Sequence, residues 1–156
     1  MDLYQKSFPF HEQRPPSSQA QIMGQGEYLF YAIYEEKEWI GLLLCWETKK
    51  FIYVEHFCID PEKRNQKYGQ RALRLLCRQG KTVILEIDPP IDEVSLRRKD
   101  FYERAGFQAN SFAHLHPPYH EGFSGHPLLV MSYPERLSEA EYHQFNRYLK
   151  DTVMRF

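Results

Sequence analysis

The sequence predicts a mixed α/β fold, an α+β mixed sheet in which an antiparallel meander is followed by a parallel strand pair with flanking helices. Two observations lead to this prediction. Three segments rich in aromatic and β-branched residues follow one another with only short polar turns between them, as antiparallel neighbours do. The next apolar segment comes only after an amphipathic helix, and strands joined through a helix lie parallel.

The three meander strands are predicted at residues 27–34, 39–46 and 51–59. The second is an almost continuous apolar run, which is typical of a strand buried on both faces. Before them, the Pro- and Gln-rich start of the chain predicts only a short helix around residues 17–23.

The remaining elements are bounded by glycine and proline signals. Gly80 and Gly106 stand where helix C′ residues are expected, and Ser138 with Glu141 forms a capping box next to the hydrophobic pair Leu137 and Tyr142. The predicted order is a helix opening near Gly69, a strand at 82–87, a helix at 95–105, strands at 107–116 and 128–133, and a closing helix at about 138–153.

Composition describes a globular chain. Charged residues make up 26% and apolar residues 42% of 156 positions, so the chain is neither disordered nor a membrane protein. Its formal net charge of −1 argues against bulk nucleic-acid binding, which needs a basic face throughout. No run reaches transmembrane length and the N-terminus lacks an apolar signal segment. We expect a single domain over residues 1–156, with no membrane or nucleic-acid partner.

The three cysteines, Cys45, Cys58 and Cys77, lie within apolar strand or helix patterns. They are odd in number and lack metal-type spacing, which favours reduced core residues of a cytoplasmic protein.

The segment that joins the third strand to the first long helix indicates a binding site. Asp60-Pro-Glu-Lys63 breaks the strand, and Arg64 to Gly69 lead into the helix. The first turn of a helix has unpaired N–H groups and the positive end of the helix dipole. Such a terminus binds phosphate or pyrophosphate readily.

Element order and two partial motifs resemble the GNAT superfamily of acetyl-CoA-dependent N-acetyltransferases over residues 27–133. Arg64-Asn-Gln-Lys-Tyr-Gly69 is similar to the family's R/Q-x-x-G-x-G/A turn, with Lys67 where glycine is usual, and Ile59 to Arg64 resembles its V-x-P-x-x-R approach. Phe101-Tyr-Glu-Arg-Ala-Gly-Phe107 is similar to the F/L-Y-x-x-x-G-F signature. The resemblance implies a GNAT-like fold whose parallel strands are splayed apart.

The resemblance also implies acetyl-CoA as co-substrate, with its thioester in the splay. The backbone of Phe57, Cys58 and Ile59 would pair with the pantetheine amides, and Ser95 stands where the family often has Asn. Lys67 can replace the glycine only if its φ is negative and its Cβ points away from the ligand, and its ammonium would then add to phosphate binding. In the alternative, the affinity for the cofactor is reduced or lost. The N–H groups from Gln66 to Gln70 would hold the pyrophosphate. The cofactor-binding residues implied at this turn are Arg64, Asn65, Gln66, Lys67, Tyr68, Gly69 and Gln70.

Tyr102 resembles the general acid of many family members. A phenol with a pKa of ~10 is protonated at neutral pH and can donate to the departing sulfur. The alternative is that Tyr102 only packs, with its hydroxyl bonded to backbone.

Glu55 is the predicted general base. Simple strand alternation places it on one face with Tyr53, Phe57 and Ile59, where apolar neighbours would raise its pKa. His56 would then point to the opposite face. The alternative for Glu55 is a salt bridge.

Four histidines, His114, His116, His120 and His126, surround a Pro-rich loop. Although His114 and His116 share a strand face that would suit a metal, no cysteine or paired carboxylate completes a ligand set. With Tyr119 and Phe123, this loop is interpreted as part of the acceptor wall or as a homodimer contact.

The leading hypothesis is an N-acetyltransferase that moves an acetyl group from acetyl-CoA directly to a primary amine. The alternative is a non-catalytic acyl-CoA-binding sensor or scaffold of the same fold. A phosphotransfer protein would need a Gly-rich loop with Lys-Ser/Thr, which the sequence lacks.

Overall fold

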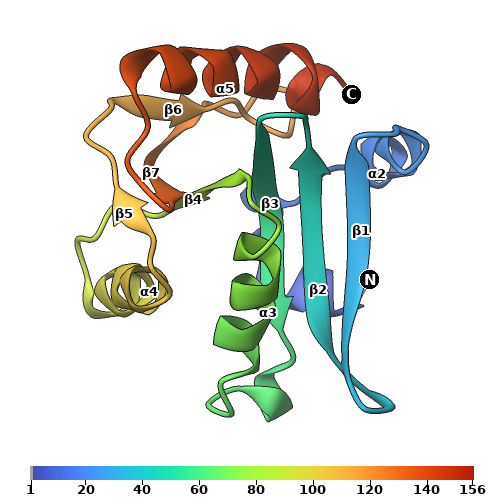
Figure 1. Ribbon diagram of the computed structural model, residues 1–156. Helices are drawn as coiled ribbons and strands as arrows, with labels where there is room; N and C mark the ends of the chain where they lie inside the picture. Colours follow the sequence, from blue (N-terminus) through green and yellow to red (C-terminus); the bar gives the residue numbers. More distant parts are fainter. Residues whose placement is uncertain (1) are drawn as a thin grey trace.

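The computed structural model describes residues 2–156 and, within them, one mixed sheet (Figure 1). Strand order is β1-β2-β3-β4-β7-β5, and β6 pairs with the start of β7. Only β3 and β4 are parallel neighbours. The strands are β1 (Tyr28–Glu35), β2 (Glu38–Glu47), β3 (Phe51–Ile59), β4 (Thr82–Ile87), β5 (Gln108–Ala109), β6 (His114–His116) and β7 (His126–Tyr133).

Helices cover both faces of this sheet. On one face, residues of α3 and α4 share a hydrophobic core with β3, β4 and β7. On the other, α5 and the N-terminal helices pack over a second core that includes Trp46 and Tyr53. Figure 1 shows α3 in front of β3 and α5 across the end of the sheet. The helices are α1 (Asp2–Ser7), α2 (Pro16–Ile22), α3 (Tyr68–Cys77), α4 (Glu93–Arg104) and α5 (Glu139–Asp151), with short 3₁₀ turns η1 (Phe10–Glu12), η2 (Pro61–Lys63) and η3 (Val153–Arg155).

The predicted antiparallel meander and the parallel pair are confirmed, and β3 and β4 span the predicted residues. The capping box of α5 is present, with Ser138 accepting from the backbone of Glu141. The predicted strand at 107–116 is instead two short strands, β5 and β6. Residues 2–156 contain no helix that is both long and apolar enough to cross a membrane.

A β-bulge in β3 and the splay of the parallel pair begin at adjacent residues. Against β2, His56 pairs with Leu44 and Val54 with Cys45, so Glu55 is the extra residue of a bulge. Against β4, pairing ends at Val54–Leu85, whereas β3 continues to Ile59. Because a bulge bends its strand, β3 turns away from β4 at this point. The end of β3 therefore has a free edge inside the sheet.

Candidate active site

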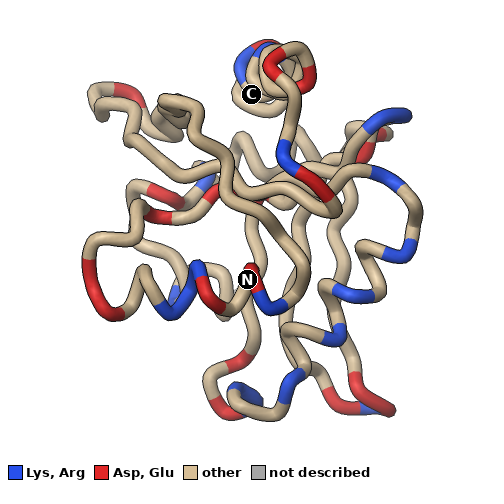
Figure 2. The backbone as a smooth tube through the Cα atoms, turned by 60° about the vertical axis from the view of Figure 1, so that its left-hand side comes forward, with Lys and Arg blue, Asp and Glu red and all other residues tan. Residues whose placement is uncertain are grey.

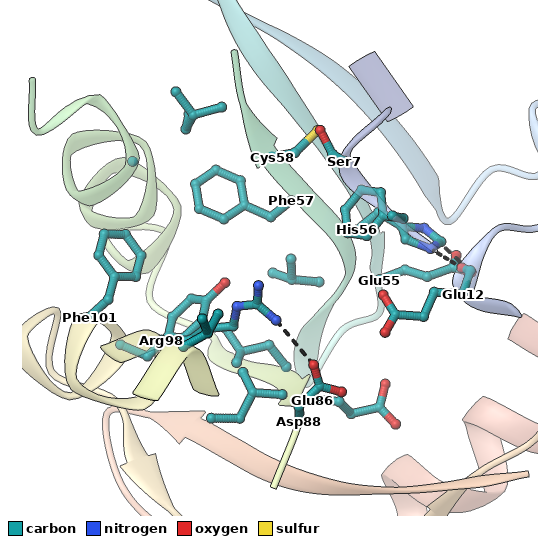
Figure 3. A pocket seen from close by; sticks show the side chains of 18 of the residues that line it. Ser7, Glu12, Glu55, His56, Phe57, Cys58, Glu86, Asp88, Arg98 and Phe101 are labelled. Carbon is teal, nitrogen blue, oxygen red and sulfur yellow. Dashed lines mark hydrogen bonds and ion pairs between the residues drawn. The ribbon is translucent and has the colours of Figure 1, made fainter. Parts of the chain in front are cut away.

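A cavity of about 1090 Å³ opens at this splay (Figure 3). Part of its wall belongs to the α3–α4 side of the sheet, through Phe57, Leu85 and Tyr102. The opposite part contains Glu55, Glu86 and Tyr119, which lie with the core of the α5 side. The cavity thus passes through the sheet and joins its two faces.

The turn before α3 forms one end of the cavity. The first backbone bond of α3 runs from Arg71 N to Lys67 O at 3.1 Å, which leaves the N–H groups of the preceding turn free of helical partners. Lys67 has φ 64° and ψ 13°, in the left-handed region, so the negative φ that was the condition for a lysine at this position is not found. Asn65 also has φ 64°. The turn keeps a glycine-like path at a cost of about 1–2 kcal/mol per residue, and such turns direct successive N–H groups at an anion.

Most residues predicted to hold a cofactor do line the cavity. Two do not: within residues 2–156, its wall includes neither Gln66 nor Ser95. Because α4 begins at Glu93 rather than at Ser95, the Ser95 hydroxyl lies in the first turn and closes a capping box with Asp92. The prediction that Ser95 contacts the cofactor is therefore corrected to a helix cap. The predicted residues in the wall are Glu55, Phe57, Cys58, Ile59, Arg64, Asn65, Lys67, Tyr68, Gly69, Gln70 and Tyr102.

Gly69 stands where α3 meets α4. A Cβ built there would lie 3.1 Å from the ring of Phe101. The glycine therefore allows the helix terminus and the second motif of the sequence to approach closely, which brings the phosphate-type turn toward Tyr102.

Tyr102 is a buried phenol in the cavity wall. Among the described residues its hydroxyl has no hydrogen-bond partner. The packing alternative required a bond from this hydroxyl to a backbone group, and that bond is not present among them. Burial raises the pKa of Tyr102 to about 12, with a smaller lowering contribution from Arg98. The phenol is therefore protonated at neutral pH and its proton is free to be donated into the cavity.

Glu55 is a buried ion-pair partner. Its Oε2 accepts from Arg14 Nη2 at 2.8 Å and from Tyr119 at 2.7 Å, and its Oε1 accepts from Trp46 Nε1 at 2.9 Å. Burial would raise the pKa of Glu55, but Arg14 and these hydrogen bonds outweigh it and lower the pKa to about 2. The predicted raised pKa is wrong, and the salt-bridge alternative describes this residue.

The bulge also changes which residues share a face. Tyr53, Glu55 and His56 all lie on the α5 side, whereas Phe57 packs in the core of the α3–α4 side. His56 contacts the rings of Tyr4 and Phe8 from the N-terminal segment. The predicted opposition of His56 and Glu55 is therefore wrong, because the extra residue reverses the alternation of side chains.

Sequence reasoning missed a second buried carboxylate, Glu86 of β4. It accepts a hydrogen bond from Tyr53, and His114 Nε2 lies 2.5 Å from its Oε2. Burial opposes ionisation, yet the charges and hydrogen bonds of His116, His114 and Tyr53 lower the pKa of Glu86 overall. A signal was available, since Glu86 is the only charged residue of β4, where it follows the apolar run Val83-Ile-Leu85. Arg14 gave no such signal in its Pro-rich segment.

The histidine-rich loop contributes to the cavity. His116, Tyr119 and His126 line it, as do Ser7, Phe8 and Glu12 of the N-terminal segment. Residues 2–156 contain no cluster of three or more His, Cys, Asp or Glu side chains placed to hold a metal ion. This end of the cavity is thus built from the two chain segments that lie outside the recognised motifs.

Charges are distributed over the whole surface. In Figure 2, basic and acidic positions are interspersed along the chain rather than gathered on one side. Near the cavity, the half-exposed Arg98 is paired with Asp88 at 3.2 Å (Figure 3). The site is therefore distinguished by its buried polar groups and not by a concentration of charge of one sign on the surface.

A sheet opened between two parallel strands, beside a helix N-terminus and a buried phenol, is the architecture expected of an acyltransferase. The family model of the GNAT acetyltransferases matches residues 1–107. The chain belongs to this family and is an N-acetyltransferase by class.

Solved structures agree. A Bacteroides thetaiotaomicron protein assigned to the GNAT family is 31% identical, with a TM-score of 0.92 over 98% of this chain and 88% of that one. The ribosomal-protein-S18-alanine N-acetyltransferase of Escherichia coli (16% identity, TM-score 0.59, 88% and 86% covered) and Naa50 of Arabidopsis thaliana (17%, 0.59, 84% and 87%) share the fold. No curated protein has a matching sequence.

Proposed function

We propose that this protein transfers the acetyl group of acetyl-CoA to a primary amine by direct attack in a ternary complex. The observation that carries the proposal is the cavity through the sheet, with a phosphate-type turn at one end and the unpaired Tyr102 hydroxyl in its wall. A structurally similar aminoglycoside 6′-N-acetyltransferase was solved in complex with coenzyme A, which supports the choice of donor.

The donor would enter from the α3–α4 side. Free N–H groups of residues 66–70 suit a pyrophosphate, and the exposed Lys67 adds a positive charge beside them. The free edge of β3 at Phe57, Cys58 and Ile59 can pair with the amides of a pantetheine chain, as an added strand would. The thioester then lies beside Tyr102.

The acceptor amine would reach the thioester carbonyl from the α5 side. Its nitrogen forms a bond to the carbonyl carbon, the carbon–sulfur bond breaks, and the thiolate takes the proton of Tyr102. A thiolate in the same buried cavity has its own pKa raised by desolvation, which favours this transfer. The proton that the nitrogen loses on becoming an amide is released to solvent in the cavity, from which the tyrosinate is reprotonated. Glu55, already saturated by Arg14, Trp46 and Tyr119, is assigned a positioning role instead of the predicted role of base.

A thiol-release assay tests the proposal. Wild-type protein with acetyl-CoA and a panel of primary amines should release CoA thiol, and Tyr102→Phe should release it much more slowly. Tight acetyl-CoA binding without turnover across the panel would instead support a non-catalytic sensor.

A further inference from the structure

Two proton acceptors face each other on the acceptor side of the cavity. His116 Nε2 lies 3.8 Å from Glu86 Oε1, which is too far for a direct hydrogen bond. Both residues line the cavity, and both side chains are almost fully buried, at 3% and 5% exposure. The gap between the two atoms is therefore a place where a third polar group can lie.

The hydrogen bonds of His116 define its tautomer. Its Nδ1 lies 2.6 Å from the carbonyl oxygen of Pro117, and a carbonyl oxygen only accepts. Nδ1 must therefore carry a proton, so in the neutral ring Nε2 has a free lone pair. That lone pair is on the nitrogen that faces Glu86 and the cavity.

We propose that His116 is the general base that takes a proton from the acceptor ammonium, with Glu86 stabilising the imidazolium that results. The inference rests on the acetyl transfer proposed above. The ammonium N–H bond breaks, its proton moves to Nε2, and the neutral amine keeps the electron pair that attacks the thioester. Glu86 Oε1 already accepts from Tyr53 and keeps a second lone pair, so the ammonium supplies the donor that His116 Nε2 lacks.

The placement of acid and base supports this assignment. Tyr102 belongs to the core on the α3–α4 side of the sheet, whereas Glu86, the partner of His116, is bonded to Tyr53 and His114 of the α5 side. In direct transfer the amine adds to one face of the thioester carbonyl and the sulfur leaves from another position on the same carbon, so the base must reach the nitrogen while the acid reaches the sulfur. The cavity through the splay provides that arrangement.

Neighbouring histidines are less suited to the role. Both ring nitrogens of His114 are engaged, by Tyr142 at 2.8 Å and by Glu86 at 2.5 Å, and this residue is not among the described residues that line the cavity. His126 stacks on His116 with ring centroids 5.2 Å apart. Charged and titratable groups that face His116 come from several elements, namely Glu86 of β4, Glu12 of η1, His56 of β3, His126 of β7 and Tyr119 of the loop.

A comparison of acceptors that differ in their protonation state tests whether His116 acts as the base. Hydroxylamine is already neutral at pH 7.5, whereas an alkylamine is an ammonium, with a pKa of about 10. Loss of a general base should lower kcat/KM about 100-fold or more for the best alkylamine of the panel, but by much less for hydroxylamine. We therefore expect His116→Gln to be selectively impaired with the alkylamine, and the rise of its pH–rate profile with this acceptor to move to higher pH, toward the pKa of the amine.

His114→Gln is the matched control, on the same strand and beside the same carboxylate. It should lower the melting temperature yet leave the ratio of alkylamine to hydroxylamine rates unchanged. Equal losses of His116→Gln with both acceptors, or a selective loss in His126→Gln instead, would overturn the proposal.

An NMR measurement tests His116 without any acceptor. In ¹⁵N-labelled wild-type protein at pH 7.5, the long-range ¹H–¹⁵N spectrum should show His116 with Nδ1 protonated and Nε2 unprotonated. The Nε2–H tautomer would refute the assignment even if thiol release is observed, whereas absent thiol release with the expected tautomer would count against the acetyl transfer alone.

Discussion

Arg14 Nη2 lies 2.8 Å from Glu55 Oε2, and both side chains are 1% exposed. The same nitrogen donates to the carbonyl oxygen of Val153 at 2.8 Å, and Nη1 donates to Ser18. One guanidinium therefore connects the bulge of β3 with both ends of the chain. A buried pair is costly to break from one side because it leaves an uncompensated charge.

Replacing Arg14 with methionine should destabilise the protein by about 3–5 kcal/mol, measured by urea unfolding. Adding Glu55→Gln should recover part of that loss, since the buried charge is then removed. Arg97→Met is the control: Arg97 pairs with Glu93 on the exposed surface of α4, where such pairs contribute about 0–1 kcal/mol. Similar losses in both arginine variants would contradict the buried-pair account.

Glu55 should also make stability depend on pH. Its folded pKa of about 2 lies below the ordinary value of 4.5, so its contribution is present above pH 4.5 and is lost as the pH falls toward 2. The full contribution is on the order of 3 kcal/mol. Urea unfolding of wild type between pH 6 and pH 3 should show this decline, and Glu55→Gln should show a shallower one. Parallel plots of unfolding free energy against pH for wild type and Glu55→Gln would refute this role of Glu55.

Tyr102→Phe should lower kcat by about 100-fold, because the proton donor to the thiolate is lost. The KM for acetyl-CoA and the melting temperature should change little, since no described residue bonds to the hydroxyl that is removed. A packing role would give the opposite pattern, with stability lost and kcat preserved.

Substitution of Lys67 separates backbone conformation from charge. Lys67→Gly should be more stable than Lys67→Ala by about 1 kcal/mol, because only glycine adopts the left-handed conformation without strain. Both variants lose the ammonium, so both should raise the KM for acetyl-CoA about two- to fivefold, as expected for an exposed charge contact of ~0.5–1 kcal/mol. Calorimetry and KM values at low salt provide the comparison.

The sequence predicted the fold well because the strands around the site are strongly marked. Lys49-Lys50 comes directly before the apolar run of β3, and Asp60-Pro61 follows it; Asp88-Pro89 follows the run of β4. The predicted residues of both strands are those observed. Tyr102 and the turn at Gly69 were located by motif spacing, and both line the cavity.

The surroundings of Glu55 could not be predicted, because one extra residue in a strand leaves no periodic signal but reverses every side chain after it. The partners of Glu55 lie far away in sequence, at Arg14 and Tyr119. The left-handed φ of Lys67 was likewise hidden, since a lysine is not the residue that this conformation favours.

The hydrogen bond from Arg14 to Val153 spans 139 positions, and this has a consequence for synthesis on the ribosome. Residues 14 and 55 leave the exit tunnel long before residue 153 is made. The acceptor side of the site can therefore be completed only after residue 153 has been made, so a nascent chain can display the donor turn before Arg14 and Glu55 are fixed in place.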